Sequence, residues 1–151
     1  MQYIRNEEEE DVSNPLLPSV SFVKCPIHLC AGILGKKWTM LILRDIGMRR
    51  IQRFNRLLEH ISGITPRVLS QRLKELEQEG FIECVERNGP KLVRWDLTEK
   101  GEDTLPILMS FIAFGSKWYA DEAFEDKKPR TLKQIYKTLE AREVIEKYST
   151  G

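Results

Sequence analysis

The stretch ITPRVLSQRLKELEQEG, from Ile64 to Gly80, gives the clearest structural signal in the sequence. Thr65 suits the cap of a helix, Pro66 its first turn and Gly80 its end. At about 100° of rotation per residue, one stripe of this helix holds Leu69, Leu73 and Leu76. The opposite side holds Arg67, Gln71, Lys74 and Gln78. Such a helix can present groups that pair with base edges and phosphates, although an ordinary amphipathic helix with a solvated face has the same pattern.

Charge is segregated along the chain, which has 151 residues and a formal net charge of +1. Residues 1–23 contain five acids and one arginine, a net charge of −4. Residues 36–74 contain ten lysines and arginines against two acids, a net charge of +8, and residues 75–86 contain five acids and no base. A basic block inside a neutral chain favours contact with nucleic acid, and the alternative is a surface rich in arginine for solubility.

Composition excludes several classes of protein. Hydrophobic residues make up 41% of the chain, enough for a core, yet no stretch approaches the ~20 apolar residues of a membrane-spanning helix. The N-terminus, MQYIRNEEEED, is acidic and lacks the basic and apolar regions of a secretory signal. We therefore expect a cytoplasmic protein.

Motifs for catalysis and metal binding are absent from the sequence. We find no GxSxG, no phosphate-binding glycine loop and no HExxH. The three cysteines, Cys25, Cys30 and Cys84, form no CxxC, and only two histidines are present. These features argue against a structural zinc site, and a reducing cytoplasm argues against disulfides. We expect no enzyme, no cofactor, no metal, and burial of Cys30 and Cys84.

Three helices are predicted before the stretch that starts at Ile64. They run from about Pro26 to Leu34, from near Lys37 to before Gly47, and from Gln52 to His60. The buried face of the second is predicted to hold Trp38, Leu41, Ile42 and Ile46, and that of the third Phe54, Leu57, Leu58 and Ile61. Because only Ser62, Gly63 and Ile64 separate the third helix from the helix that starts at Pro66, the two form a helix-turn-helix with Ile64 filling the turn.

After Gly80 the hydrophobic period changes to that of strands. Residues Phe81 to Arg87 and Leu92 to Leu97 flank the turn Asn88-Gly89-Pro90. In the second strand the hydrophobic residues Val93, Trp95 and Leu97 alternate with the polar residues Arg94 and Asp96. A hairpin directly after a helix-turn-helix is a wing. Its tip, with Arg87, Asn88 and Lys91, suits contact with a phosphate backbone, although a solvated turn would look the same.

The C-terminal third predicts two helices that the small domain cannot cover fully. The helix from Glu99 to about Ala120 has two apolar stripes, and Pro106 predicts a kink or a late start. A helix from Thr131 to about Lys147 opens with the capping box Thr131-x-x-Gln134. Because one stripe needs a partner, we expect both helices to form a homodimer interface. Its residues are predicted to be Leu105, Leu108, Phe111, Ile112, Phe114, Trp118, Ile135 and Leu139.

The predicted fold is mainly α with a small β-hairpin. A flexible acidic arm covers residues 1–23, a winged helix-turn-helix domain residues 24–98, and C-terminal dimerisation helices residues 99–151. The helix from Pro66 would enter the major groove of double-stranded DNA, where Arg67 can pair with guanine and Gln71 with adenine. Other groups would contact phosphates or base edges: Thr65, Ser70, Lys74, Arg50, Arg53, Arg56, Arg87 and Lys91.

Several motifs in register resemble the HxlR family of transcriptional regulators, in the MarR-like group of winged helix proteins. They are CPI at Cys25–Ile27, GKKW at Gly35–Trp38 followed by LILRD, RFNRL at Arg53–Leu57, GITPRVLSQRLKELEQEGFIE at Gly63–Glu83 and VRWDLTEKG at Val93–Gly101. The resemblance runs from about Cys25 to Trp118. It implies a homodimer on a pseudo-palindromic operator, with half-sites about one helical turn apart.

The resemblance also implies a role for Cys25, since some HxlR-like regulators have a thiol here that senses oxidants or electrophiles. A thiol just before a helix N-terminus has a stabilised thiolate. The residues themselves favour the simpler interpretation, in which Cys25 is a small residue that fills the dimer interface. The signal, whether redox or an unidentified small-molecule effector, is open. The competing hypothesis for the whole protein is a winged helix module that binds an acidic protein partner rather than DNA.

Overall fold

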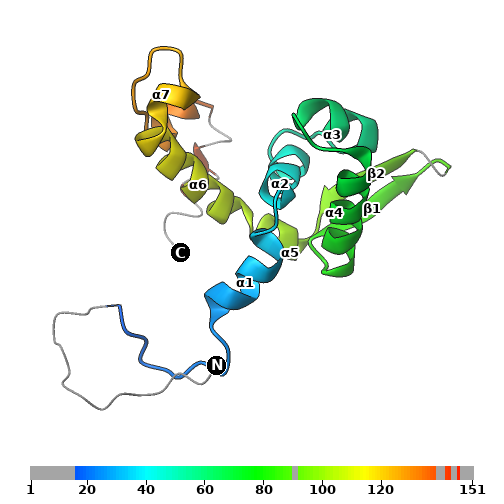
Figure 1. The fold of residues 1–151 in the computed structure, drawn as a ribbon, viewed down its shortest axis with the longest axis horizontal. Coiled ribbons are helices and arrows are strands. Elements are labelled where there is room, and N and C mark those ends of the chain that lie inside the picture. The colour runs from blue at the N-terminus through cyan, green and yellow to red at the C-terminus, as the bar shows by residue number, and fades with distance from the viewer. Residues whose placement is uncertain (1–15, 90–91, 139–141, 144–145, 147–151) are drawn as a thin grey trace.

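A computed structural model describes residues 16–89, 92–138, 142–143 and 146. Figure 1 shows a winged helix-turn-helix unit from which α1 and α6 project in different directions. The helices are α1 (Pro26–Leu34), α2 (Thr39–Gly47), α3 (Phe54–His60), α4 (Pro66–Gln78), α5 (Glu99–Glu102), α6 (Leu105–Trp118), α7 (Ala120–Ala123) and α8 (Leu132–Ile135). The strands are β1 (Ile82–Arg87) and β2 (Val93–Leu97). The predicted fold class, mainly helical with one hairpin, is confirmed.

The core lies between α2, α3, α4 and the hairpin. Each of these helices contributes side chains with no exposure, among them Ile42, Leu57 and Leu69. The hairpin adds Ile82, Trp95 and Leu97. The predicted core face of α2 is wrong at Leu41, which is 37% exposed, because the buried stripe of α2 passes through Ile42, Leu43 and Ile46.

The turn between α3 and α4 has the local chemistry that the sequence predicts. Gly63 has a φ of +87°, a left-handed conformation that glycine adopts at little cost. Ile64 is buried below the turn. The Thr65 hydroxyl then accepts a hydrogen bond from the Val68 amide at 3.3 Å, and Pro66 occupies the first turn of α4. These features fix where α4 begins.

The hairpin is the wing of the fold. β1 and β2 pair antiparallel, with Cys84 opposite Trp95 and Glu86 opposite Arg94, and a bulge falls between Cys84 and Glu86. The segment before α3 lies along β2 and pairs with it through a single antiparallel bridge between Arg53 and Arg94. The hairpin is thereby tied to α3.

The predicted helix from Glu99 to Ala120 is broken into α5, α6 and α7. The first piece ends at Glu102 with Asp103 as its C-cap, and Thr104 is the N-cap of α6. The Thr104 hydroxyl donates a hydrogen bond back to the Gly101 carbonyl at 2.6 Å. Pro106 occupies the first turn of α6, where its missing N–H is tolerated, so the late start that the proline predicted is confirmed. Tyr119, with φ −117° and ψ 31°, separates α6 from α7.

The predicted continuous helix from Thr131 is also wrong. The capping box of Thr131 and Gln134 is present, but α8 ends at Ile135 because Tyr136 is extended, with φ −105° and ψ 103°. Leu139 and Ile145 lie outside the described residues. Within the described part of the chain, no helix is long and apolar enough to cross a membrane.

Candidate nucleic-acid interface

The outer face of α4 is a row of exposed polar side chains, Arg67, Ser70, Gln71, Lys74 and Gln78. Arg67 and Lys74 make no hydrogen bond or ion pair with the described residues. Gln71 donates a hydrogen bond to Glu75 Oε1 at 3.3 Å. On the inner face Leu69, Leu73 and Leu76 are buried. The structure thus places the predicted contact row where it faces solvent.

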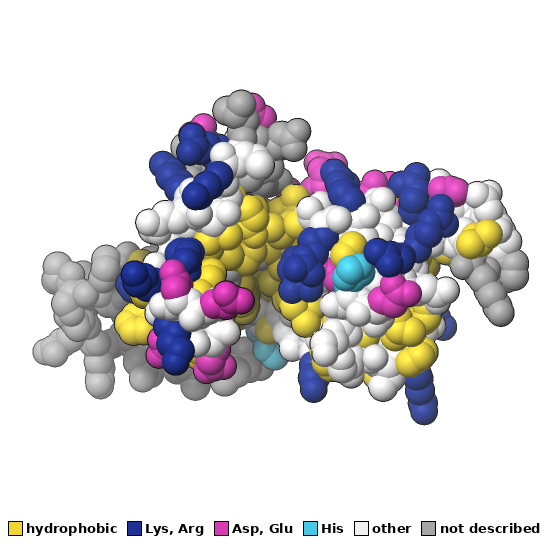
Figure 2. Space-filling model, turned by 90° about the horizontal axis from the view of Figure 1, so that it is seen from above, with side chains coloured by type: hydrophobic (Ala, Val, Ile, Leu, Met, Phe, Trp, Pro, Cys, Tyr) yellow, Lys and Arg dark blue, Asp and Glu magenta, His cyan; other side chains and the backbone are white. Residues whose placement is uncertain are grey.

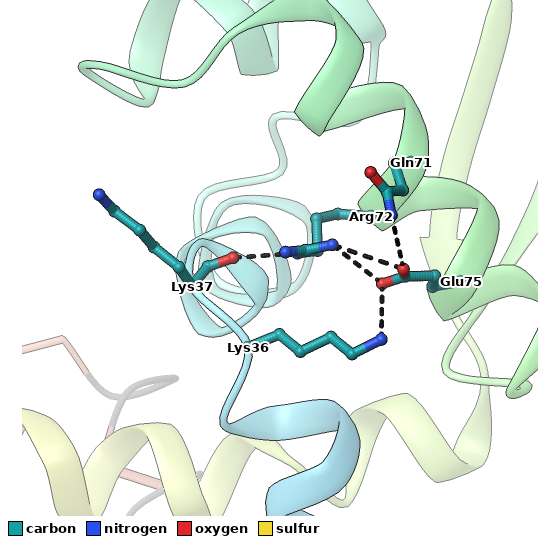
Figure 3. Close-up of polar contacts among 5 residues, drawn as sticks. All are labelled: Lys36, Lys37, Gln71, Arg72 and Glu75. Atoms are coloured by element: carbon teal, nitrogen blue, oxygen red, sulfur yellow. Dashed lines mark hydrogen bonds and ion pairs between the residues drawn. The ribbon is translucent and has the colours of Figure 1, made fainter.

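A polar cluster holds the back of α4 against the segment between α1 and α2 (Figure 3). Arg72 Nε donates a hydrogen bond to the Lys37 carbonyl oxygen at 3.0 Å. Glu75 forms ion pairs with Arg72 at 3.2 Å and with Lys36 at 3.3 Å. Desolvation raises the pKa of Glu75, but the hydrogen bond from Lys36 and the charges of Arg72 and Lys36 outweigh it and hold the pKa below its usual value.

A depression of about 550 Å³ separates α4 from the wing. Ser70 and Lys74 of α4, Asn55 of α3 and Val93 of β2 are among its lining residues. Two of the predicted contact residues therefore lie together on the rim between helix and hairpin. Asn55, which no sequence pattern indicated, lies beside them.

The three arginines predicted to hold the DNA backbone lie around a second depression, of about 360 Å³. It is lined by five arginines, Arg49, Arg50, Arg53, Arg56 and Arg94. Arg49 and Arg94 were not predicted from the sequence. The alternation of Arg94 with Val93 and Trp95 was the available signal for an outward side chain, but nothing in the sequence placed β2 beside residue 53.

Each of the three predicted arginines at this depression already has an acidic neighbour. Arg50 lies 3.5 Å from Asp96, Arg53 lies 3.2 Å from Glu86, and Arg56 lies 2.8 Å from Glu59. At the wing, Arg87 is exposed at the end of β1. Lys91 lies outside the described residues.

The predicted dimer residues divide into two groups. Leu108 is only 5% exposed and belongs to the chain's own core, so it is not available to a partner. Leu105 is half-buried against that core. Phe111 and Trp118 are each 65% exposed and Phe114 is 58% exposed. Ile112 and Ile135 are half-buried. The outward stripe of α6 is therefore Ile107, Phe111, Phe114 and Trp118, and Figure 2 shows hydrophobic side chains in a broad band beside this helix.

The cysteines do not all lie where we expected. Cys25 is the N-cap residue of α1 and is half-buried. Cys30 is exposed, contrary to prediction, because the described structure buries no residue of α1. Cys84 is half-buried in β1. Among the residues that the structure describes, no group of three or more His, Cys, Asp or Glu could hold a metal ion.

A winged helix-turn-helix with an exposed polar row on its second helix defines a class of transcriptional regulators, and the comparisons with known proteins agree. The model of the HxlR-like helix-turn-helix family matches residues 33–123. The chain belongs to this family, as its motifs suggested. The uncharacterised HTH-type transcriptional regulator sll1512 of Synechocystis is 34% identical over 104 residues, which cover 67% of this chain and 75% of that protein.

Two solved structures are similar to this chain. A MarR-family protein from Porphyromonas gingivalis is 35% identical, with a TM-score of 0.57, and the match covers 65% of this chain and 96% of that one. The reduced form of the transcriptional regulator YodB from B. subtilis is 32% identical, with a TM-score of 0.53, and covers 63% of this chain and 94% of that one.

Proposed function

We propose that the protein binds double-stranded DNA sequence-specifically, through α4, as a homodimer on a pseudo-palindromic operator. The observation that supports this most directly is the exposed row Arg67–Gln71–Lys74, set on a helix whose back is packed and held by ion pairs. A major groove is wide enough to admit such a helix. A helix fixed from behind can hold its base contacts in register.

Each side chain of the row has a distinct proposed role. Arg67, in the first turn of α4, pairs bidentately with guanine, and Gln71, one turn further, pairs with adenine. Such a contact is worth about 1–3 kcal/mol of discrimination between bases. Thr65 uses its hydroxyl oxygen for the helix cap, which leaves the O–H able to donate to a phosphate. Ser70 contacts a phosphate or a base edge.

The remaining basic residues are proposed to hold the phosphate backbone. Lys74 contacts it beside the depression between α4 and the wing. Arg50, Arg53 and Arg56 contribute from the segment before and within α3, and Arg87 and Lys91 from the wing. These contacts carry no sequence information, so each loss should weaken binding to every duplex and reduce the salt dependence.

The homodimer is supported by hydrophobic surface that the single chain leaves exposed. On α6 this surface is Ile107, Phe111, Phe114 and Trp118, and on α1 it includes Ile27 and Leu29. Burying side chains of this size contributes about 1.5–3 kcal/mol each. A second copy of the chain would cover them, and two copies of α4 would then face half-sites about 34–36 Å apart.

Cys25 is the residue that we propose for a redox response. Its position at the N-cap of α1 favours the thiolate. The reduced YodB structure is named for its redox state, and a structure of diamide-treated YodB also resembles this chain. A small-molecule effector is the alternative signal.

A gel shift tests the function. The full-length protein is mixed with DNA fragments flanking its own gene at about 50 and 200 mM salt. We expect one fragment to be retarded at both concentrations and random duplex only at the lower one. Absence of any DNA shift, together with capture of an acidic protein partner, would overturn the proposal in favour of a protein-interaction module.

A further inference from the structure

We call the second depression, lined by Arg49, Arg50, Arg53, Arg56 and Arg94, the arginine depression. Side chains alternate across a strand, so Arg94 lies on the side of β2 opposite to Trp95, which is buried in the core. The segment before α3 pairs with β2 through Arg53. The depression is therefore separate from the row on α4.

Positive charge exceeds negative charge around this depression. In the described part of the chain, the five arginines that line the depression form ion pairs with only four carboxylates, and one of these, Asp45, is shared with Arg44 outside the lining. The arginines are Arg49, Arg50, Arg53, Arg56 and Arg94, and the carboxylates are Asp45, Glu59, Glu86 and Asp96. Beside the arginines, the lining consists of Ile51 and Gln52, with no aromatic ring.

Glu86 lies where donors from three segments converge. Its Oε2 accepts hydrogen bonds from Arg53 Nη2 at 3.2 Å and from Arg94 Nε at 3.0 Å, and its Oε1 accepts one from Asn88 Nδ2 at 2.6 Å. The bonds from Arg94 and Arg53 hold the pKa of Glu86 below its usual value, so the carboxylate is ionised. Two guanidinium groups directed at one anionic oxygen are the arrangement that also binds phosphate.

Arg50 reaches the depression from a costly backbone conformation. Its φ is +57°, in the left-handed region that residues other than glycine rarely adopt. Such conformations concentrate at ligand-binding and other functional sites.

We propose that the arginine depression is a binding site for a phosphate group. When no phosphate is bound, the Glu86 carboxylate occupies its position beside Arg53 and Arg94. An arriving phosphate takes over Arg53 and Arg94 from Glu86. The phosphate belongs either to the backbone of a duplex, in which case the inference rests on the proposed function of Arg53, or to a small phosphorylated ligand, because both present the same oxygens to the arginines. Glu86 thereby weakens the affinity of the site.

The test compares Glu86→Gln with the wild type in two assays. One measures binding of random-sequence duplex DNA by fluorescence anisotropy, and the other measures binding of inorganic pyrophosphate by calorimetry. We expect Glu86→Gln to bind at least one probe about threefold to tenfold more tightly, since it removes one competing charge. Tighter duplex binding identifies the backbone as the source, and tighter pyrophosphate binding alone identifies a small ligand.

Glu83→Gln is the matched control. It removes the same charge from an exposed position of the same strand, and Glu83 has no ion pair with the described residues. Its affinities should stay within about twofold of the wild type, because only its long-range charge acts. Adding Arg94→Gln to Glu86→Gln should abolish the gain.

The proposal is overturned if Glu86→Gln binds neither probe more tightly, if Glu83→Gln gains as much, or if the gain survives Arg94→Gln. Because Glu86 also joins the wing to the segment before α3, its variant can lose stability. Arg53→Gln and Arg94→Gln in the wild-type background then give the second measurement, and unchanged binding of both probes in both variants overturns the proposal equally. None of these outcomes depends on base recognition by α4.

Discussion

Arg72 Nε and the carbonyl oxygen of Lys37 lie 3.0 Å apart, so a hydrogen bond joins the back of α4 to the segment between α1 and α2. The same segment contributes Lys36, which pairs with Glu75 one turn further along α4. The proposed reading helix is therefore fixed both by its leucines in the core and by a polar contact to the region before α2.

The Glu75 contact predicts a specific dependence of stability on pH. Because its pKa is below the ordinary 4.5 in the folded protein, the unfolded chain binds protons more readily. The stability that Glu75 contributes is fully present above pH 4.5, and it is lost as the pH falls through the lower pKa that Glu75 has in the folded protein. Glu75→Gln should lower the free energy of unfolding by about 0.5–1 kcal/mol at pH 7 and by less in acid. Urea unfolding at several pH values measures this, with Glu77→Gln on the exposed face as the control. An equal loss at every pH would contradict the assignment.

The dimer prediction concerns the outward stripe of α6. Phe114→Asp should weaken self-association at least about tenfold, because a charge in a hydrophobic interface is costly. Sedimentation equilibrium at micromolar concentration measures the change. Val85→Asp places the same charge at an exposed hydrophobic position of the wing and should leave the dimer intact. A wild-type protein that is monomeric throughout would refute the interface.

A packing prediction concerns Gly101 of α5, which lies against Phe81, the residue before β1. A Cβ at this position would collide with the carbonyl oxygen of Phe81, which belongs to the backbone and cannot rotate away. Gly101→Ala should therefore cost about 1–3 kcal/mol of stability. At Gly115 in α6 a Cβ has no neighbour within 4 Å, so Gly115→Ala is the control and should keep or raise the Tm. Equal Tm values for the two variants would contradict the described packing.

A redox prediction concerns Cys25. Diamide should change the DNA affinity of the wild type, and Cys25→Ser should abolish that response, because a helix N-terminus favours the thiolate of a cysteine at the N-cap. Anisotropy titrations before and after treatment measure it. Cys30→Ser is the informative control, since Cys30 is exposed on the same helix. A full response in Cys25→Ser would exclude the sensor and leave Cys25 as a packing residue.

Local patterns in the sequence predicted the helix-turn-helix well. The cap at Thr65, the proline at 66 and three leucines on one stripe define α4 without reference to the rest of the chain. The hairpin followed from alternation at Val93, Trp95 and Leu97. Each of these signals depends on residues within a few positions of one another, which is why sequence alone was sufficient.

Features that depend on distant contacts were harder to predict. Two stripes of α6 are equally apolar in sequence, and only the fold shows that Leu108 faces the chain's own core while Phe111 and Phe114 face outward. The arginine depression assembles because residue 53 pairs with residue 94. The ion pair between Arg53 and Glu86 joins residues 33 positions apart in the sequence, which no local pattern reveals.

The central claim is that the outer face of α4 reads DNA sequence, and competition binding tests it most directly. The wild type, Arg67→Ala and Gln71→Ala are each titrated against an operator duplex and duplexes with single base-pair substitutions. We predict that each variant loses discrimination between base pairs at one position in each half-site, by about 1–3 kcal/mol. The affinity of Gln71→Ala for random duplex should change little, because this substitution removes no charge. Unchanged operator affinity and unchanged base preference in both variants would contradict the account.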